Sequence, residues 1–103
     1  MALTEDLIKH NTTAAAFRKG KQLASTGAVE DLLIERDEQD QVQYINGKVA
    51  GNIEAHYKVS LDFDEKRQEI IATHCECEAY RSIPGYCKHI VGLALVAIEE
   101  EKK

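Results

Sequence analysis

The chain has no tryptophan, one proline, two phenylalanines and four tyrosines among its 103 residues. So few aromatic side chains predict a modest hydrophobic core, and small domains of this kind often need a staple such as a bound metal. No apolar run approaches the length of a membrane-spanning helix, so we expect no membrane partner. The chain also lacks a glycine-rich loop followed by Lys-Ser or Lys-Thr, which argues against a P-loop nucleotide site.

Acidic residues outnumber basic ones, and the formal net charge is −5. That balance does not favour binding to a polyanion. The charges are unevenly spread, however, because residues 7–29 contain four cations and no acid, whereas residues 30–40 are strongly acidic. The four cations are Lys9, Arg18, Lys19 and Lys21. This cluster is either a local basic face or an ordinary solvated helix face.

Helical patterns occupy both ends of the chain. Thr4 and the acids after it are typical of a helix start, and the pattern continues to about Ser25, with residues 11–13 as a point where it could divide. Gly27 is a plausible stop. A second helix follows Cys87, and one apolar face of that helix is expected to cover a sheet. That face carries Ile90, Leu93, Ala94 and Ala97.

Four strands are expected between the helices. Their ranges are 29–36, 42–49, 57–63 and 68–73. In the first we expect Val29 and Leu33 to supply apolar area, with Leu32 as a further candidate, and in the second Asn46-Gly47 could introduce a kink or a turn. The third has the clearest alternation of apolar and polar residues, which is typical of a half-buried strand. We therefore predict an α+β fold, with about four antiparallel strands packed by an N-terminal and a C-terminal helix.

Three cysteines and one histidine fall in one short pattern, Cys75-x-Cys77-x9-Cys87-x-His89. Residues i and i+2 of an extended chain point to the same side, so Cys75 and Cys77 can present both sulfurs to one ion. Cys87 and His89 lie at the start of the expected helix, where a turn lets them converge and where the helix N-terminus stabilises a thiolate. Four such ligands can close around one tetrahedral Zn²⁺ that joins the last strand to the last helix.

Roles without zinc are also open to these residues. Free cysteines are often small buried hydrophobes, and the pair Cys75/Cys77 could act as a thiol redox switch. An odd, clustered set of cysteines argues against a disulfide framework and fits a reducing compartment, so we expect a cytoplasmic protein. His74 could compete for the metal, although a surface strand histidine is the interpretation we favour. His10 and His56 have no second ligand at a suitable spacing.

The ligand pattern resembles that of the SWIM zinc finger, CxCx(n)CxH. The resemblance covers about residues 14–98 and includes further segments at 17–21, 27–29, 51–53, 57–61 and 87–90. It implies a Zn²⁺-binding module, of the kind often found beside bacterial Swi/Snf-type ATPases or in Mutator-like transposases. It also implies a role in binding DNA or protein partners.

By size, residues 1–103 are expected to form one domain, with the finger proper at residues 75–98. The charged end at residues 99–103 has no helix-stop glycine, which suits either a frayed end or a piece cut from a longer protein. We favour the second interpretation, because the modules that the chain resembles usually accompany other domains.

A non-catalytic interaction module is the function we predict. Four protein ligands fill a tetrahedral zinc ion and leave no position for water or substrate, so we expect no enzymatic activity and no small-molecule substrate. DNA is the first candidate partner, bound weakly through Arg81 and Lys88 of the finger, joined by Arg18, Lys19 and Lys21.

The alternative partner is a protein surface with no nucleic-acid contact. Aromatic and apolar anchors carry much of the energy of protein interfaces. Tyr80, Ile83 and Tyr86, on the loop between the two ligand pairs, would supply them. These three side chains could equally serve to shield the zinc.

Overall fold

The computed structural model describes residues 3–39, 41–51, 56–77 and 85–102. Its elements, in chain order, are α1 (Glu5–His10), α2 (Ala14–Ser25), β1 (Val29–Asp37), β2 (Val42–Ala50), β3 (His56–Asp64), β4 (Glu69–Cys75) and α4 (Lys88–Glu101). The strands form one antiparallel meander in the order β1-β2-β3-β4. The predicted α+β class, with a four-stranded sheet between N-terminal and C-terminal helical segments, is confirmed.

The N-terminal helical segment divides where the polar residues 11–13 suggested that it could. Each piece has its own cap, because the Thr4 hydroxyl accepts from the amide of Leu7 and the Thr13 hydroxyl accepts from the amide of Ala16. A capping hydroxyl satisfies one of the free amides at a helix start and so favours beginning a new helix there. Beyond α2 the chain turns at Gly27, whose φ of 77° is readily adopted by glycine.

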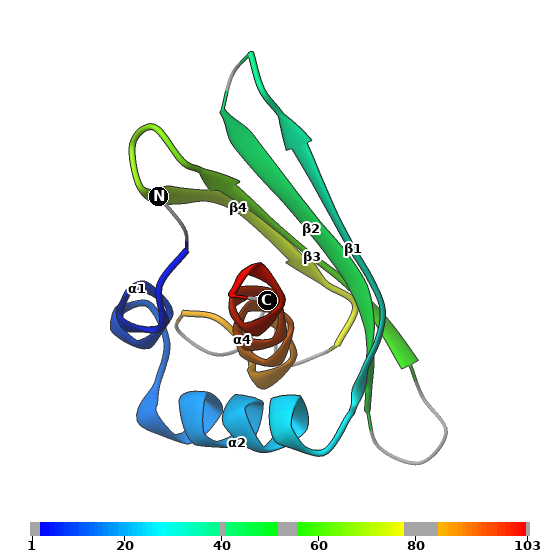
Figure 1. The fold of residues 1–103 in the computed structure, drawn as a ribbon. Helices are drawn as coiled ribbons and strands as arrows, with labels where there is room; N and C mark the ends of the chain where they lie inside the picture. The colour runs from blue at the N-terminus through cyan, green and yellow to red at the C-terminus, as the bar shows by residue number, and fades with distance from the viewer. Residues whose placement is uncertain (1–2, 40, 52–55, 78–84, 103) are drawn as a thin grey trace.

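The helices lie on one side of the sheet in two layers, with α4 between the sheet and the pair α1 and α2 (Figure 1). We expected one apolar face of α4 to cover the sheet. The helix is instead buried on nearly all sides, which is typical of a helix with apolar residues all round. In the described part of the chain, no helix combines the length and the apolar character needed to cross a membrane.

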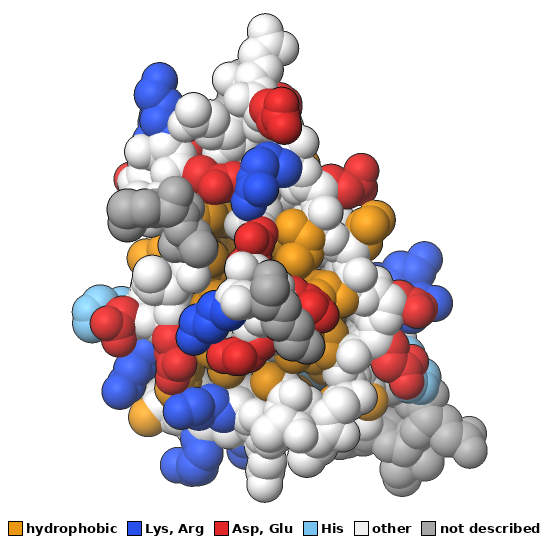
Figure 2. All heavy atoms as spheres, in the orientation of Figure 1, with side chains coloured by type: hydrophobic (Ala, Val, Ile, Leu, Met, Phe, Trp, Pro, Cys, Tyr) orange, Lys and Arg blue, Asp and Glu red, His pale blue; other side chains and the backbone are white. Residues whose placement is uncertain are grey.

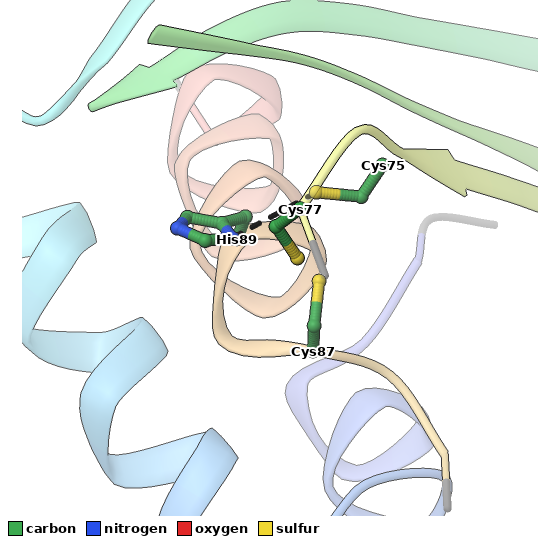
Figure 3. Close-up of side chains that lie close together, drawn as sticks. All are labelled: Cys75, Cys77, Cys87 and His89. Atoms are coloured by element: carbon green, nitrogen blue, oxygen red, sulfur yellow. Dashed lines mark hydrogen bonds between the residues drawn. The ribbon is translucent and has the colours of Figure 1, made fainter. Parts of the chain in front are cut away.

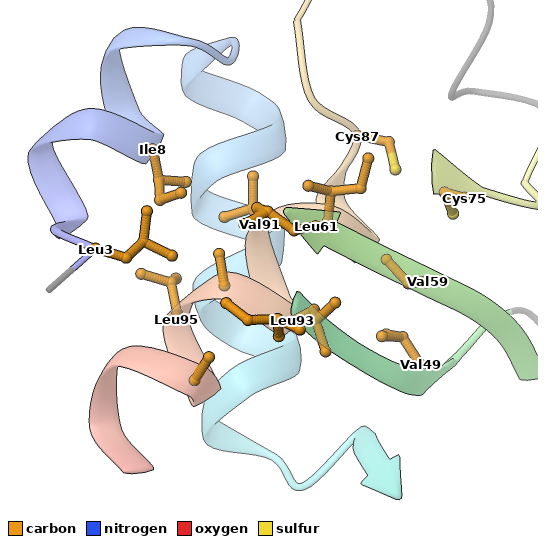
Figure 4. Packing of buried hydrophobic residues seen from close by; sticks show 14 of the residues in the cluster. Leu3, Ile8, Val49, Val59, Leu61, Cys75, Cys87, Val91, Leu93 and Leu95 are labelled. Carbon is orange, nitrogen blue, oxygen red and sulfur yellow. The ribbon is translucent and has the colours of Figure 1, made fainter. Parts of the chain in front are cut away.

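The core lies between the sheet and these helices (Figure 4). Val59, Leu61 and Phe63 of β3 are all buried, as the alternation in the sequence predicted. Ile45 and Val49 of β2 lie on the same face. Since successive residues of a strand point to opposite faces, the polar residues between them face away from the helices.

The apolar face of β1 differs from the prediction. Leu33, expected to be buried with Val29, is 52% exposed. The register between β1 and β2 shifts between Glu30 and Leu33, and Asp31 in this irregularity has a φ of 53°. One extra residue reverses the direction of the side chains that follow it, so Leu32, the further candidate, packs against the core together with Ile34, and Leu33 does not.

The kink expected at Asn46-Gly47 is absent, because β2 runs unbroken from Val42 to Ala50. Gly47 serves the packing of α4 instead. A Cβ atom added at Gly47 would lie 2.8 Å from Cδ1 of Leu93, so the missing side chain lets the helix approach the sheet.

Candidate metal centre

The four residues of the cysteine and histidine motif meet at the junction of β4 and α4. Cys75 is the last residue of β4 and Cys77 follows two residues later. Cys87 is the N-cap residue of α4, and His89 lies in the first turn of that helix. Their side chains point toward one another (Figure 3).

The spacing of the four side chains fits one small ion. One ligand atom from each residue lies within 4.8 Å of all the others, and all four residues are buried. The Cys75 Sγ atom is 3.7 Å from Nδ1 of His89. Zinc at its usual distances in a tetrahedral site would hold a sulfur and a nitrogen about 3.6 Å apart. The arrangement therefore needs little movement to become a closed Cys₃His site, with His89 offering Nδ1.

Two local contacts turn both cysteines of the first pair inward. The pairing of Val59 with Cys75 keeps the end of β4 in the sheet. Glu76, between the two cysteines, points outward, and its carboxylate accepts a hydrogen bond of 2.8 Å from the amide of Lys58. Because neighbouring residues of an extended chain alternate in direction, holding Glu76 outward directs Cys75 and Cys77 to the same side.

The thiols of Cys75 and Cys87 differ in acidity because they share hydrogen bonds. The hydrogen bond from Cys75 lowers the pKa of Cys87 to about 4, with further contributions from His89 and the backbone amide of Ile90 at the start of α4. The hydrogen bond to Cys87, followed by burial, raises the pKa of Cys75. Metals bind the thiolate form of cysteine, and the hydrogen bonds around Cys87 favour that form.

The N-terminal helices hold the second ligand pair in place. The amide of Tyr86 donates to the carbonyl of Asn11 at 3.0 Å, and the Thr12 hydroxyl donates to the carbonyl of Tyr86 at 2.6 Å. Gly85 has a φ of 80°, and a Cβ atom there would lie 2.4 Å from the carbonyl oxygen of Asn11. The sequence did not predict this contact, since nothing in the polar stretch at residues 11–13 signals a partner far along the chain.

Replacing Gly85 with alanine is expected to lower the free energy of unfolding by at least about 2 kcal/mol, because left-handed backbone costs a non-glycine residue ~1–2 kcal/mol and the clash with Asn11 adds to it. Urea unfolding of the zinc-loaded protein measures the change. Gly27→Ala is the matched control, since Gly27 also has positive φ but a Cβ atom there meets nothing within 4 Å. Equal losses in the two variants would contradict the proposed contact with Asn11.

The other candidate site residues that the sequence suggested are not part of this cluster. His74 pairs with Ser60 on the face of the sheet away from the helices, and it is not among the residues that surround the possible metal. Lys19 of α2 and Lys88 of α4 line one surface hollow with Gln22, Leu23 and Thr26. Arg81, Tyr80 and Ile83 lie outside the described residues, and Tyr86 is half-buried.

Lys21 has an acidic neighbour in space, although residues 7–29 contain no acid. Its ammonium lies 3.3 Å from the Glu5 carboxylate and 5.6 Å from the centre of the Phe17 ring. The acid comes from α1, which residues 11–13 bring back beside α2. Arg18 and Lys19 remain exposed, and no ion pair is found for them within the described residues.

A buried, convergent set of three cysteines and one histidine is the donor set of a closed, structural zinc site. Residues 57–98 match the family model of the SWIM zinc finger, and this segment includes all four residues of the cluster. The family and the cluster together point to a bound zinc ion, as the sequence predicted. The match begins at Tyr57, and the resemblance noted for residues 14–56 lies outside it. Comparisons with curated proteins and with solved structures returned no match.

Proposed function

We propose that Cys75, Cys77, Cys87 and His89 are the four ligands of a structural zinc ion, and that the domain is a non-catalytic module that contacts the phosphate backbone of DNA. The ligand set supports a structural role, because four protein ligands leave zinc no open position for water or substrate. When bound, zinc would supply a rigid link between the end of β4 and the start of α4.

The observation that carries the DNA proposal is the meeting of Lys19 and Lys88 at one hollow. These lysines come from α2 and from the first turn of α4, and the hollow between them is also lined by the polar side chains of Gln22 and Thr26. Arg18 is exposed beside Lys19, and the first turn of α2 carries no acid. Lys and Arg side chains gather over α1 and α2 at the lower left of Figure 2, with acidic side chains beside them.

Lys88 connects this hollow to the proposed zinc site. Lys88 stands between the ligands Cys87 and His89, so a metal that fixes the start of α4 also fixes the position of this lysine. Phosphate contacts position a protein on DNA but carry no base code, so binding through these cations would be independent of sequence. Such a module would assist an attached ATPase or transposase in a reducing compartment such as the cytoplasm, where thiolates stay available to zinc.

A titration of the zinc-loaded protein with a short fluorescent DNA duplex tests the proposal. Non-specific binding typically has a Kd of ~10⁻⁴–10⁻⁶ M at physiological salt, and an acidic protein should fall at the weak end of that range. The affinity should fall steeply as salt rises, because bound cations release counterions from DNA. Lys19→Ala with Lys88→Ala should weaken binding about equally for all sequences.

The matched control is Lys66→Ala, which removes an exposed lysine from the hairpin between β3 and β4, away from the hollow. This control should bind the duplex like the unaltered protein. Absence of binding even at low salt, or an equal loss in the control, would remove the support for DNA. Arg81 stays a predicted contact, and its replacement belongs in the same series.

A protein partner is the second candidate function, and the outer face of the sheet favours it. Leu33 and Tyr44, which are 52% and 37% exposed, point away from the helices. Ile71, at the irregularity between β3 and β4, is 51% exposed. Exposed apolar side chains of this size suit a protein interface, and binding through them should change little with salt, in contrast to a contact with DNA.

A further inference from the structure

The imidazole of His89 has one nitrogen that the zinc site leaves unused. Nδ1 faces the Cys75 sulfur at 3.7 Å, so Nε2 points away from the three cysteines (Figure 3). His89 is only 3% exposed, and within the described residues Nε2 finds no hydrogen-bond partner. A histidine that binds metal through one nitrogen usually donates the other N–H to a carboxylate, carbonyl or water, which fixes the orientation of the ring.

An aromatic ring packs against this imidazole. The ring of Tyr57 lies with its centre 4.9 Å from the centre of the imidazole, and the two planes are tilted by 53°. Tilted and offset contacts of this kind are the favoured geometries of aromatic pairs, because the positive edge of one ring meets the negative face of the other. Because the two rings are in contact, the Tyr57 ring also limits rotation of the His89 imidazole about the bond that joins it to the rest of the side chain.

The backbone at Gly51 also lies against the Tyr57 ring. A Cβ atom added to Gly51 would lie 2.2 Å from Cε2 of Tyr57, so the ring fills the space that this glycine leaves open. Tyr57 pairs with Val49 near the start of β3, and Val59, two residues further along the same face, pairs with Cys75. One strand therefore sets the ring against His89 and also holds the end of the strand that carries the first zinc ligand.

We propose that Tyr57 is a positioning residue of the zinc site, which orients the His89 imidazole toward the metal through ring contact. This inference rests on the assignment of His89 as a zinc ligand. The role is assigned to the ring of Tyr57, because the centres of the two rings lie 4.9 Å apart. The role adds a fifth side chain to a site whose sequence signature names only four.

The test compares zinc affinity by competition with a chromophoric chelator in three variants. Tyr57→Leu keeps an apolar side chain but removes the ring, and it should weaken zinc binding about 10–100-fold, the usual range for losing a supporting contact to a ligand. Tyr57→Phe keeps the ring and should bind zinc like the unaltered protein. Gly51→Ala leaves Tyr57 in place but pushes its ring, and should cause a smaller loss in the same direction.

Cobalt substitution provides a readout that a loss of general stability would not change. The visible absorption bands of bound Co²⁺ report the ligand geometry, and they should change in Tyr57→Leu and Gly51→Ala but not in Tyr57→Phe. Ile45→Ala, a change in the buried core of β2, should lower stability without changing the bands. If Tyr57→Leu fails to fold, Gly51→Ala carries the same comparison.

The outcomes distinguish a failure of the proposed role of Tyr57 from a failure of the assignment of His89 as a zinc ligand. Unaltered affinity and bands in Tyr57→Leu and Gly51→Ala, with zinc still bound through His89, would overturn the role of Tyr57 alone. A Tyr57→Phe variant as weak as Tyr57→Leu would show that the hydroxyl matters and would overturn the ring contact. Unaltered protein that binds no zinc would overturn the ligand assignment first.

Discussion

Removal of zinc with a strong chelator is expected to unfold most of this domain. Structural zinc contributes about 10–16 kcal/mol of apparent binding free energy in zinc-finger peptides at neutral pH. Domains of ordinary size are stable by only about 5–15 kcal/mol in total. Because the ligands come from the end of β4 and the start of α4, losing the metal releases the helix that forms the central layer of the fold.

Elemental analysis of the purified protein should find one zinc ion per chain, and circular dichroism should report the loss of structure on chelation. Hydrogen exchange should show lost protection over residues 90–98 and also in α2, which packs on α4. Adding zinc back in reducing buffer should restore both signals. An unaltered spectrum and exchange pattern without zinc would contradict a structural role for the metal.

A matched pair of histidine variants tests whether the loss of structure comes from the cysteine and histidine cluster. His89→Ala removes a proposed ligand and should reproduce the effect of chelation, as should Cys87→Ser. His74→Ala removes a histidine next to Cys75 that faces away from the cluster, so it should keep zinc and stability. Loss of zinc in His74→Ala would place a different histidine at the metal.

Gly20→Val is expected to have the second largest effect, a loss of about 3 kcal/mol or more in the free energy of unfolding, at the upper end of overpacking costs. A Cβ atom at Gly20 would lie 2.3 Å from Cγ1 and 2.5 Å from Cβ of Val91, and 3.0 Å from the carbonyl oxygen of Lys88. Two of these atoms are backbone or are attached to it, so rotating a side chain cannot relieve the clash. The helices α2 and α4 must move apart.

Chemical unfolding of zinc-loaded protein measures the loss, and Val91→Ala in the same chain should recover part of it. Gly92→Ala is the control across the same helix pair, because a Cβ atom there approaches Leu23 Cβ only to 3.3 Å. Its small clash is offset by the helix propensity that alanine gains over glycine, about 1 kcal/mol. Equal destabilisation by the two substitutions would contradict close packing at Gly20.

The sequence by itself determined the features that depend on neighbouring residues. The alternation at residues 57–63 predicted β3 and its buried face, since side-chain direction in a strand follows a period of two. The spacing of Cys75, Cys77, Cys87 and His89 predicted a cluster of ligands, because each pair converges through local geometry alone. Thr4 and Gly27 marked helix boundaries for the same reason.

Only the tertiary structure decided the features that join distant segments. One bulge at Asp31 exposed Leu33, and no local pattern in β1 announces it. Three further contacts form only after separate parts of the chain have packed together. They are the ion pair of Lys21 with Glu5, the close approach of Gly85 to Asn11 and the ring contact of Tyr57 with His89. In the sequence Tyr57 is one more apolar residue of a strand. It reaches the metal site because β3, β4 and α4 share one core, and packing of that kind depends on the whole chain.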